Sequence, residues 1–338
     1  MGLRTLLPGL GFLVAVAGLA HAVGAATPLH SLLAAILLGA VVANTVGVPA
    51  VLQPGADTYK LWLEVGIVLM GARISLDAIL GAGPTLLVAV IGVVTLSLAA
   101  VEALARGPFG LQDWFGSLLA AGSSICGVSA VVAVAGAVRA NESHVAYATS
   151  TILVFDAVTL FAYPALGHVL GLPDRVFGIW AGLSMFSTGP VTAAGFAYSE
   201  IAGQWAVVTK LTRNALLGGL VVVYSLLYAE TGTASGGTDT AADSGGRATL
   251  GSLWDGFPKF VLGFVSLAVL ASSGLLADAE IARVEVAYRW AFLVAFAGLG
   301  TSIEAGEVRG AGLRPLALVG VALAVVSAVS LAVAQAVF

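Results

Sequence analysis

The chain has 338 residues, of which 59% are hydrophobic and only 9% are charged. Soluble domains carry roughly 25% charged residues, so this composition, with a mean hydropathy of +1.03, excludes a soluble globular protein and indicates an integral membrane protein. The 14 basic and 18 acidic residues leave a formal net charge of -4, which argues against a nucleic-acid partner because such a partner requires a basic patch.

The cysteine and histidine content narrows the chemistry further. The single cysteine, Cys126, excludes an internal disulfide and any metal site built from several cysteines. The histidines have no metal-ligand spacing, and no Walker-type phosphate loop occurs. We therefore expect no metal, no cofactor and no ATP-driven pumping.

Apolar stretches that approach the length of a membrane span recur along the whole chain. They are residues 6–23, 29–47, 61–80, 85–104, 113–138, 144–169, 176–199, 203–228, 257–276, 284–300 and 315–337. A transmembrane helix needs about 20 mostly apolar residues, so we predict an all-α polytopic membrane protein with about eleven transmembrane helices. Residues 81–84 are expected to form a turn, and the Gly- and Ser-rich residues 231–251 a solvent loop between segments 8 and 9. Residues 1–338 then form a single membrane transport domain.

The distribution of Arg and Lys between the loops predicts the orientation. With the N-terminus inside, the outer loops hold only Arg139 and Arg283. The inner loops then hold Arg4, Lys60, Arg106, Arg175, Arg247, Arg309 and Arg314. We expect a multi-pass protein of the cell (plasma or inner) membrane with a cytoplasmic N-terminus. The first stretch also resembles a signal peptide, but the next apolar run follows so closely that a retained helix is favoured.

The fifth stretch is interrupted in its middle by small and polar residues. Glycine costs helix propensity, and serine can cap a new half-helix. Unwound backbone at membrane depth is tolerated only where it is buried or lines a cavity, and a half-helix N-terminus attracts anions. We therefore predict a broken helix at a substrate site; a continuous helix in tight contact with its neighbours is the alternative. The candidate substrate ligands here are Ser123, Ser124, Cys126, Gly127 and Ser129.

The seventh stretch carries a similar interruption, Ser-Thr-Gly-Pro at residues 187–190. It predicts a second broken helix, with Ser187 and Thr188 as further candidate substrate ligands. Paired broken helices that face each other at the bilayer midplane are typical of secondary transporters.

Two cations lie deep in the eighth stretch. Lys210, Arg213 and Asn214 are spaced i, i+3 and i+4, which places them on one helix face. At about 1.5 Å per residue, Arg213 lies about 15 Å into the stretch. Ionisable residues at this depth are costly and usually functional, so we predict that Lys210 and Arg213 bind an anionic substrate. The alternative is that the helix begins later and both residues lie at the interface.

Two other charged residues fall within apolar stretches. Arg73 is a further candidate substrate ligand, and it could instead pair with Asp77 one helical turn later. Asp156 is a candidate site for a coupling proton or sodium ion, and it could equally neutralise Lys210 or Arg213.

The chain also shows an internal repeat. The motif Gly-Ala-Arg-Ile-Ser at residues 71–75 reappears as Gly-Thr-Ser-Ile-Glu at residues 300–304, and Gly-Ala-Gly at residues 81–83 reappears at residues 310–312. Both matches share one offset. The number of intervening segments would make the two copies run in opposite directions, so we predict an inverted repeat. Chance similarity in a Gly- and Ala-rich sequence is the alternative.

Three motifs resemble those of a known family. They are Gly-Ile-Val-Leu-Met-Gly-Ala-Arg at residues 66–73, Ser-Ser-Ile-Cys-Gly-Val-Ser-Ala at 123–130 and Thr-Lys-Leu-Thr-Arg at 209–213. The chain thereby resembles the YeiH/UPF0324 family, a family of proposed sulfate exporters. The resemblance implies a multi-pass inner-membrane protein with a bile-acid-symporter-like fold. Many members carry a histidine and an acid at the second break, where this chain has Phe-Ser-Thr at residues 186–188.

These features together predict a secondary transporter of a small anion, with sulfate or a sulfonate suggested by the resemblance. Its partners would be the lipid bilayer, the anion and a coupling proton or sodium ion. One alternative is an anion channel, which conducts without coupling. The other is a membrane-embedded enzyme with Cys126 as its nucleophile, although no histidine in the motif supplies a base.

Overall fold

The computed structural model describes residues 3–27, 29–74, 76–230, 258–303 and 312–338, and every regular element in them is a helix. This confirms the predicted all-α class. The predicted solvent loop, residues 231–251, lies outside the described residues. The elements are α1 (Leu3–Ala26), α2 (Ser31–Thr45), α3 (Gln53–Ala56), α4 (Tyr59–Met70), the 3-10 turn η1 (Gly71–Arg73), α5 (Leu76–Arg106), α6 (Asp113–Ser124), α7 (Val128–Ala135), α8 (Glu142–Val169), α9 (Asp174–Ser184), α10 (Thr188–Tyr198), α11 (Glu200–Asn214), α12 (Leu217–Glu230), α14 (Phe260–Ser272), α15 (Asp278–Thr301) and α17 (Leu313–Val337).

Five helical stretches among the described residues are long and apolar enough to cross a membrane. They are Thr5–Ala26, Leu80–Arg106, Glu142–Val169, Glu200–Tyr228 and Leu313–Val337. The apolar helices α2 and α14 are shorter. The other predicted segments also hold helices, but these are broken, short or more polar. The total of about eleven crossings, which rests on the length rule, therefore stays a prediction.

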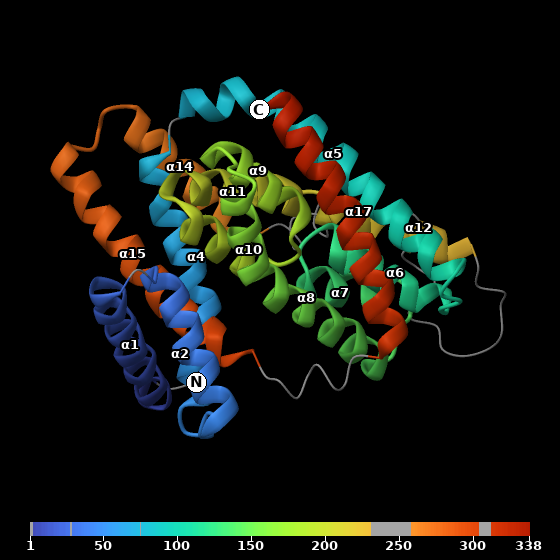
Figure 1. Cartoon of the computed structure of the whole chain (residues 1–338), viewed down its shortest axis with the longest axis horizontal. Coiled ribbons are helices and arrows are strands. Elements are labelled where there is room, and N and C mark those ends of the chain that lie inside the picture. Colours follow the sequence, from blue (N-terminus) through green and yellow to red (C-terminus); the bar gives the residue numbers. More distant parts are fainter. Residues whose placement is uncertain (1–2, 28, 75, 231–257, 304–311) are drawn as a thin grey trace, which may run out of the picture.

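The helices form two bundles (Figure 1). In the first bundle, α15 packs on α2 and α4, while α1 covers α2 and α3, and α14 packs on α4 and η1. In the second bundle, α11 packs on α9 and α10, α8 contacts α6, α7 and α10, and α5 and α17 pack on each other. Contacts of α10 with α2 and α15 join the bundles. The cavity described below lies at this junction.

Close contacts at glycines fit the predicted repeat. A Cβ on Gly300 of α15 would collide with the Ile36 carbonyl of α2. A Cβ on Gly71 would lie 2.5 Å from the Phe264 carbonyl of α14. The offset that relates Gly71 to Gly300 also relates Ala35, the neighbour of Ile36, to Phe264. The carbonyl that each glycine contacts therefore lies one residue away from the position that an exact repeat of this offset predicts. The inverted repeat itself stays a prediction.

The expected turn at residues 81–84 is wrong. These residues lie inside α5, which runs without interruption from Leu76 to Arg106 and includes Pro84. Proline removes one backbone hydrogen bond from a helix, but long apolar helices in membranes tolerate this loss. The eighth predicted segment begins slightly earlier than expected and is divided into α11 and α12 by a short turn at residues 215–216.

Candidate functional site

The first predicted break lies between α6 and α7. α6 ends at Ser124, and α7 begins at Val128 after a short unwound turn. Gly127 in this turn has φ 68° and ψ -134°, a conformation that L side chains rarely adopt. A Cβ on Gly127 would also collide with the side chain of Ser187. Only glycine therefore fits at this point.

The second predicted break lies between α9 and α10. α9 ends at Ser184, and α10 begins at Thr188 after a short segment with extended backbone at Met185 and Ser187. Because Ser187 lies against Gly127, the two breaks cross each other inside the second bundle. We call this arrangement of residues 125–127 and 185–187 the crossing.

Arg213 joins the ends of α6 and α9 at the crossing. Its side chain is completely buried. Nε donates to the Ser124 carbonyl at 2.5 Å, and Nη2 donates to the Ser123 carbonyl at 2.6 Å. Nη1 donates to the carbonyls of Met185 at 2.7 Å and Gly182 at 3.3 Å. The guanidinium thus satisfies carbonyls that the ends of both half-helices leave open.

Lys210, one turn earlier on α11, acts in the same way. Its ammonium donates to the carbonyls of Ile125 at 2.8 Å and Met185 at 3.1 Å, and to that of Phe186. These three bonds use all three of its donors. Helix C-termini carry partial negative charge, so the two cations neutralise the C-terminal ends of both half-helices.

This placement differs from the predicted role of the two cations. The sequence predicted that Lys210 and Arg213 bind the substrate, but the structure places their donors on backbone carbonyls. Neither residue lines the cavity. They hold the two breaks together through the backbone carbonyls at the ends of α6 and α9.

The N-termini of α7 and α10 face a cavity of about 1500 Å³. Val128 and Ser129 at the start of α7, and Thr188 to Pro190 at the start of α10, line this cavity. Neither first turn receives a hydrogen bond from a capping side chain. Pro190 has no N–H, and the Ala130 N–H donates to the Gly127 carbonyl at 3.1 Å. The N–H groups of Val128, Ser129, Thr188 and Gly189 are therefore the first-turn donors that could bind an anion.

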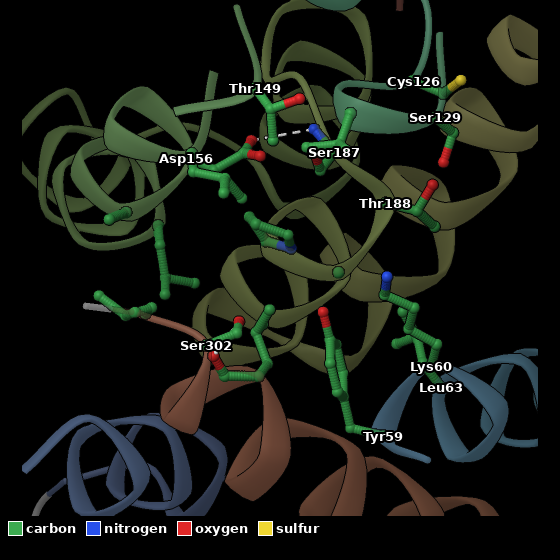
Figure 2. A pocket seen from close by; sticks show the side chains of 18 of the residues that line it. Tyr59, Lys60, Leu63, Cys126, Ser129, Thr149, Asp156, Ser187, Thr188 and Ser302 are labelled. Carbon is green, nitrogen blue, oxygen red and sulfur yellow. Dashed lines mark hydrogen bonds between the residues drawn. The ribbon is translucent and has the colours of Figure 1, made fainter. Parts of the chain in front are cut away.

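Both bundles form the walls of the cavity. The first bundle contributes residues of α4 and the end of α15, and the second contributes residues of α7, α8 and α10. Figure 2 shows Asp156, Ser187 and Thr188 on one side of the cavity, with Tyr59, Lys60 and Ser302 across from them. A cavity between two bundles is a usual place for a ligand.

Asp156 on α8 lines the cavity. Its side chain is 3% exposed. Oδ1 accepts a hydrogen bond from the Ser187 N–H at 3.0 Å, at the N-cap of α10, whereas Oδ2 has no hydrogen-bond partner among the described residues. A buried carboxylate oxygen without a donor is costly, and a bound proton or cation would satisfy it.

Asn214 carries a second unsatisfied oxygen at the same helix end. Its Nδ2 donates to the Thr188 hydroxyl at 3.1 Å, and its Oδ1 has no partner among the described residues. Asn214 was placed on the face of Lys210 and Arg213 in the sequence, and it is the member of that face that reaches the cavity. An amide at this position can present either its oxygen or its NH2 group to a ligand.

The remaining sequence candidates divide into two groups. Those that line the cavity are Cys126, Ser129, Asp156, Ser187 and Thr188. Those that do not are Arg73, Ser123, Ser124, Gly127, Lys210 and Arg213. The predicted cluster therefore divides into residues that line the cavity, residues at or beside the crossing, and Arg73, which belongs to neither part.

The side chains of the second group have other partners. Ser123 Oγ donates to the Leu119 carbonyl at 2.7 Å, and Ser124 Oγ donates to Ser97 Oγ at 2.8 Å. Arg73 forms an ion pair with Glu285 of α15 at 3.3 Å, away from the cavity. The alternative partner of Arg73 is Asp77, whose side chain is not among those that the structure describes.

Sequence reasoning missed the cavity residues of α4. Tyr59, Lys60 and Glu64 line the cavity from the first bundle. From the sequence, Lys60 is predicted only as an inner-loop charge, because it precedes the apolar run. Lys60 is the second residue of α4, just before the apolar part of that helix. A charge at such a position can lie at the mouth of a cavity, but hydropathy does not distinguish this position from a loop.

Comparison with known proteins gives consistent results along the chain. A family model described as "Conserved hypothetical protein 698" matches residues 8–319. A "UPF0324 membrane protein" of Nitratidesulfovibrio vulgaris is 34% identical over 290 residues, which cover 85% of this chain and 78% of that protein.

Two further relatives have similar coverage. One UPF0324 membrane protein of Agrobacterium fabrum is 30% identical over 303 residues, covering 89% of this chain and 83% of the relative. "UPF0324 membrane protein TauZ" of Paracoccus pantotrophus is 31% identical over 271 residues, which cover 79% of this chain and 76% of that protein. No solved structure matches the chain.

Proposed function

This chain belongs to the UPF0324 family of membrane proteins, and we propose that it is a secondary transporter that carries a small anion across the cell membrane. Sulfate or a sulfonate is the first substrate to test, because the family resemblance points to sulfur oxyanions. The protein would lie in the plasma or inner membrane with its N-terminus in the cytoplasm, as the Arg and Lys distribution favours.

One observation carries this proposal: the first turns of two half-helices, neither of which is capped by the side chain of its own N-cap residue, line a single cavity. The buried cations neutralise the opposite, C-terminal ends of the paired half-helices. The positive ends of α7 and α10 are thus left facing the cavity, where their N–H groups favour an anion. The side chains of Ser129, Ser187 and Thr188 can add hydroxyl donors at the same ends.

Asp156 supplies the proposed coupling site. Its carboxylate lies beside the N-terminus of α10, where a negative charge opposes an incoming anion. A proton or sodium ion on the free Oδ2 would remove that opposition and satisfy the oxygen. Binding of the cation and binding of the anion would then favour each other, which is the linkage that a symporter needs.

The position of the cavity supports alternating access. Its first-bundle wall includes Lys60 and Ser302, and Pro258 lies beside α14. Each of these three residues adjoins a different loop, and the distribution of Arg and Lys predicts that all three loops lie on the cytoplasmic side of the membrane. Under that orientation the cavity opens toward the cytoplasm, and rocking of the first bundle against the second would close it and expose the other side.

The alternatives make different predictions for transport. An anion channel would conduct without saturation at low concentration and without dependence on a second ion. A membrane enzyme would need a base near Cys126, and no histidine is among the cavity residues described. The transporter is favoured because Asp156 gives the cavity a second ion site.

The test is uptake of radiolabelled sulfate and of a small sulfonate into proteoliposomes, with and without imposed pH and sodium gradients. The proposal expects saturable uptake that one of the gradients accelerates, and counterflow when unlabelled anion is loaded inside. Uptake that rises linearly with concentration and ignores both gradients would indicate a channel. Absence of any anion flux, with the protein folded, would refute anion transport.

A further inference from the structure

The cavity is much larger than an inorganic anion requires. Its volume is about 1500 Å³. A water molecule takes about 30 Å³ of liquid, and pockets for drug-sized ligands measure about 300–1,000 Å³. Sulfate would therefore occupy only a small part of this space.

Most of the cavity wall is apolar, and the polar groups gather at one side. Val132 of α7 and Val158 and Phe161 of α8 line the cavity and are 58%, 54% and 39% exposed. Leu63 of α4 and Phe260 of α14 line it from the first bundle. Contact with these side chains favours an apolar group over water, by roughly fourfold in affinity for each methylene removed from water.

Lys60 is a cation at this cavity without a carboxylate partner at ion-pair distance among the described residues. Its side chain is exposed. Figure 2 shows its ammonium extending toward Thr188 at the start of α10, with the hydroxyl of Tyr59 turned into the same space. By contrast, every donor of Lys210 is held by backbone carbonyls.

We propose that the cavity binds an amphipathic organic anion, whose charged head lies between Lys60 and the first turns of α7 and α10 and whose apolar body contacts the wall formed by α4, α7, α8 and α14. This inference rests on the proposed function and narrows its substrate class to organic sulfonates or carboxylates with an apolar body. Inorganic sulfate would leave the apolar wall without a partner.

Such a ligand would bridge the two bundles. Lys60 belongs to the first bundle, and the two half-helix N-termini belong to the second. An anionic head held by both would draw the bundles together, so Lys60 would contribute to closure as well as to affinity. Glu64, one turn along α4, also lines the cavity and would weaken binding of the head if its carboxylate faced it.

The experiment measures binding to the full-length protein in lipid nanodiscs by competition and thermal shift. The probes are sulfate, methanesulfonate, benzenesulfonate and naphthalene-2-sulfonate, with neutral benzenesulfonamide as the charge control. Binding is compared for wild type, Lys60→Gln and Lys259→Gln, a matched exposed lysine that does not line the cavity.

We expect affinity to rise at least tenfold from methanesulfonate to naphthalene-2-sulfonate. Lys60→Gln should weaken naphthalene-2-sulfonate at least tenfold, and Lys259→Gln should leave it unchanged. Equal or tighter binding of sulfate than of naphthalene-2-sulfonate would overturn the amphipathic class. Unchanged affinity in Lys60→Gln would overturn the placement of the head.

These failures are distinguishable from failure of the proposed function. If sulfate is taken up saturably and arylsulfonates neither bind nor inhibit, anion transport stands and the amphipathic substrate class falls. If no anion is bound or transported by folded wild-type protein, the proposed function itself falls. Lys60→Arg, which keeps the charge, should retain most of the wild-type affinity.

Discussion

The crossing and the cavity use charge in opposite ways, although they lie next to each other. At the crossing, Lys210 and Arg213 are completely buried and their donors are satisfied by backbone carbonyls. At the cavity, Lys60 is exposed without an ion pair among the described residues, and Asp156 keeps one oxygen without a partner. Burial alone therefore does not separate the two groups of charges, whereas their hydrogen bonds do.

The difference shows how the proposed anion site can include two half-helix N-termini while the buried cations Lys210 and Arg213 serve the backbone. The two breaks bring together two helix C-termini, at the ends of α6 and α9, and two N-termini, at the starts of α7 and α10. The cations on α11 compensate the C-termini, which would otherwise carry unsatisfied carbonyls in an apolar environment. The proposed function assigns the first-turn N–H groups of α7 and α10 to the anion.

The largest effect should come from removing the guanidinium of the crossing. Arg213→Leu leaves carbonyls at the ends of α6 and α9 without donors, and breaking a buried charged network of this kind costs on the order of 3–5 kcal/mol. We expect little or no monodisperse protein after purification. Yield, size-exclusion profile and thermal unfolding in detergent measure this.

A matched variant tests whether the loss is structural. Arg213→Lys keeps the charge but loses the fork that reaches both half-helices, so it should fold with a lowered unfolding temperature. A well-folded Arg213→Leu protein that has lost only substrate binding would contradict this account, and would restore the ligand role that the sequence predicted for Arg213.

The next effect concerns coupling rather than folding. Asp156→Asn can still accept the hydrogen bond from the Ser187 N–H, but it cannot bind a proton or sodium ion as a carboxylate does. We expect a folded protein that binds the anion, with at least a tenfold loss of gradient-driven uptake and retention of counterflow. Uptake under imposed pH and sodium gradients measures this.

The matched control for that variant is Asp278→Asn, an exposed acid at the start of α15. It should behave as wild type. Asp156→Asn uptake that still responds to both gradients would remove Asp156 from the coupling mechanism.

A smaller effect is expected where the two breaks touch. Gly127→Ala places a Cβ against Ser187 and forces an L residue into a positive-φ conformation, which costs about 1–3 kcal/mol. Gly136→Ala is the control, because Gly136 has helical φ and ψ and open space around its Cα. The unfolding temperature should fall for Gly127→Ala and stay constant or rise for Gly136→Ala. Equal effects of the two changes would mean that the crossing is not tightly packed.

The local part of the site could be predicted from the sequence. Gly and Ser residues inside an apolar stretch are poor helix formers, so both breaks were identified, and Gly127 was placed in the first of them. The helical class and the apolar spans follow from composition in the same direct way. Each of these features depends on residues that are neighbours in the chain.

The partners of the charges could not be predicted, because they lie far along the chain. Spacing showed that Lys210 and Arg213 share a helix face, but not that this face meets the carbonyls of Ser123 to Ile125 and of Met185. Likewise, Lys60 lines the cavity only because the two bundles pack together there, and the sequence does not show how they pack. The turn expected at residues 81–84 failed because the apolar sequence on both sides extends the helix through Pro84.

The smallest expected effect is at Cys126, and it separates transport from enzymatic chemistry. Cys126 is 8% exposed and is the residue of the first break that both belongs to the crossing and lines the cavity. Cys126→Ala removes one sulfur from a small buried side chain, so the folded protein should retain at least half of its uptake rate, whereas an enzyme with this nucleophile would lose all activity. Modification of the wild-type thiol with methyl methanethiosulfonate adds bulk to the cavity wall and should slow uptake. The Cys126→Ala protein should be insensitive to the reagent, and bound anion should slow modification of the wild type. Loss of uptake in Cys126→Ala with an unchanged unfolding temperature would instead make the thiol a functional group, and would reopen the enzymatic alternative.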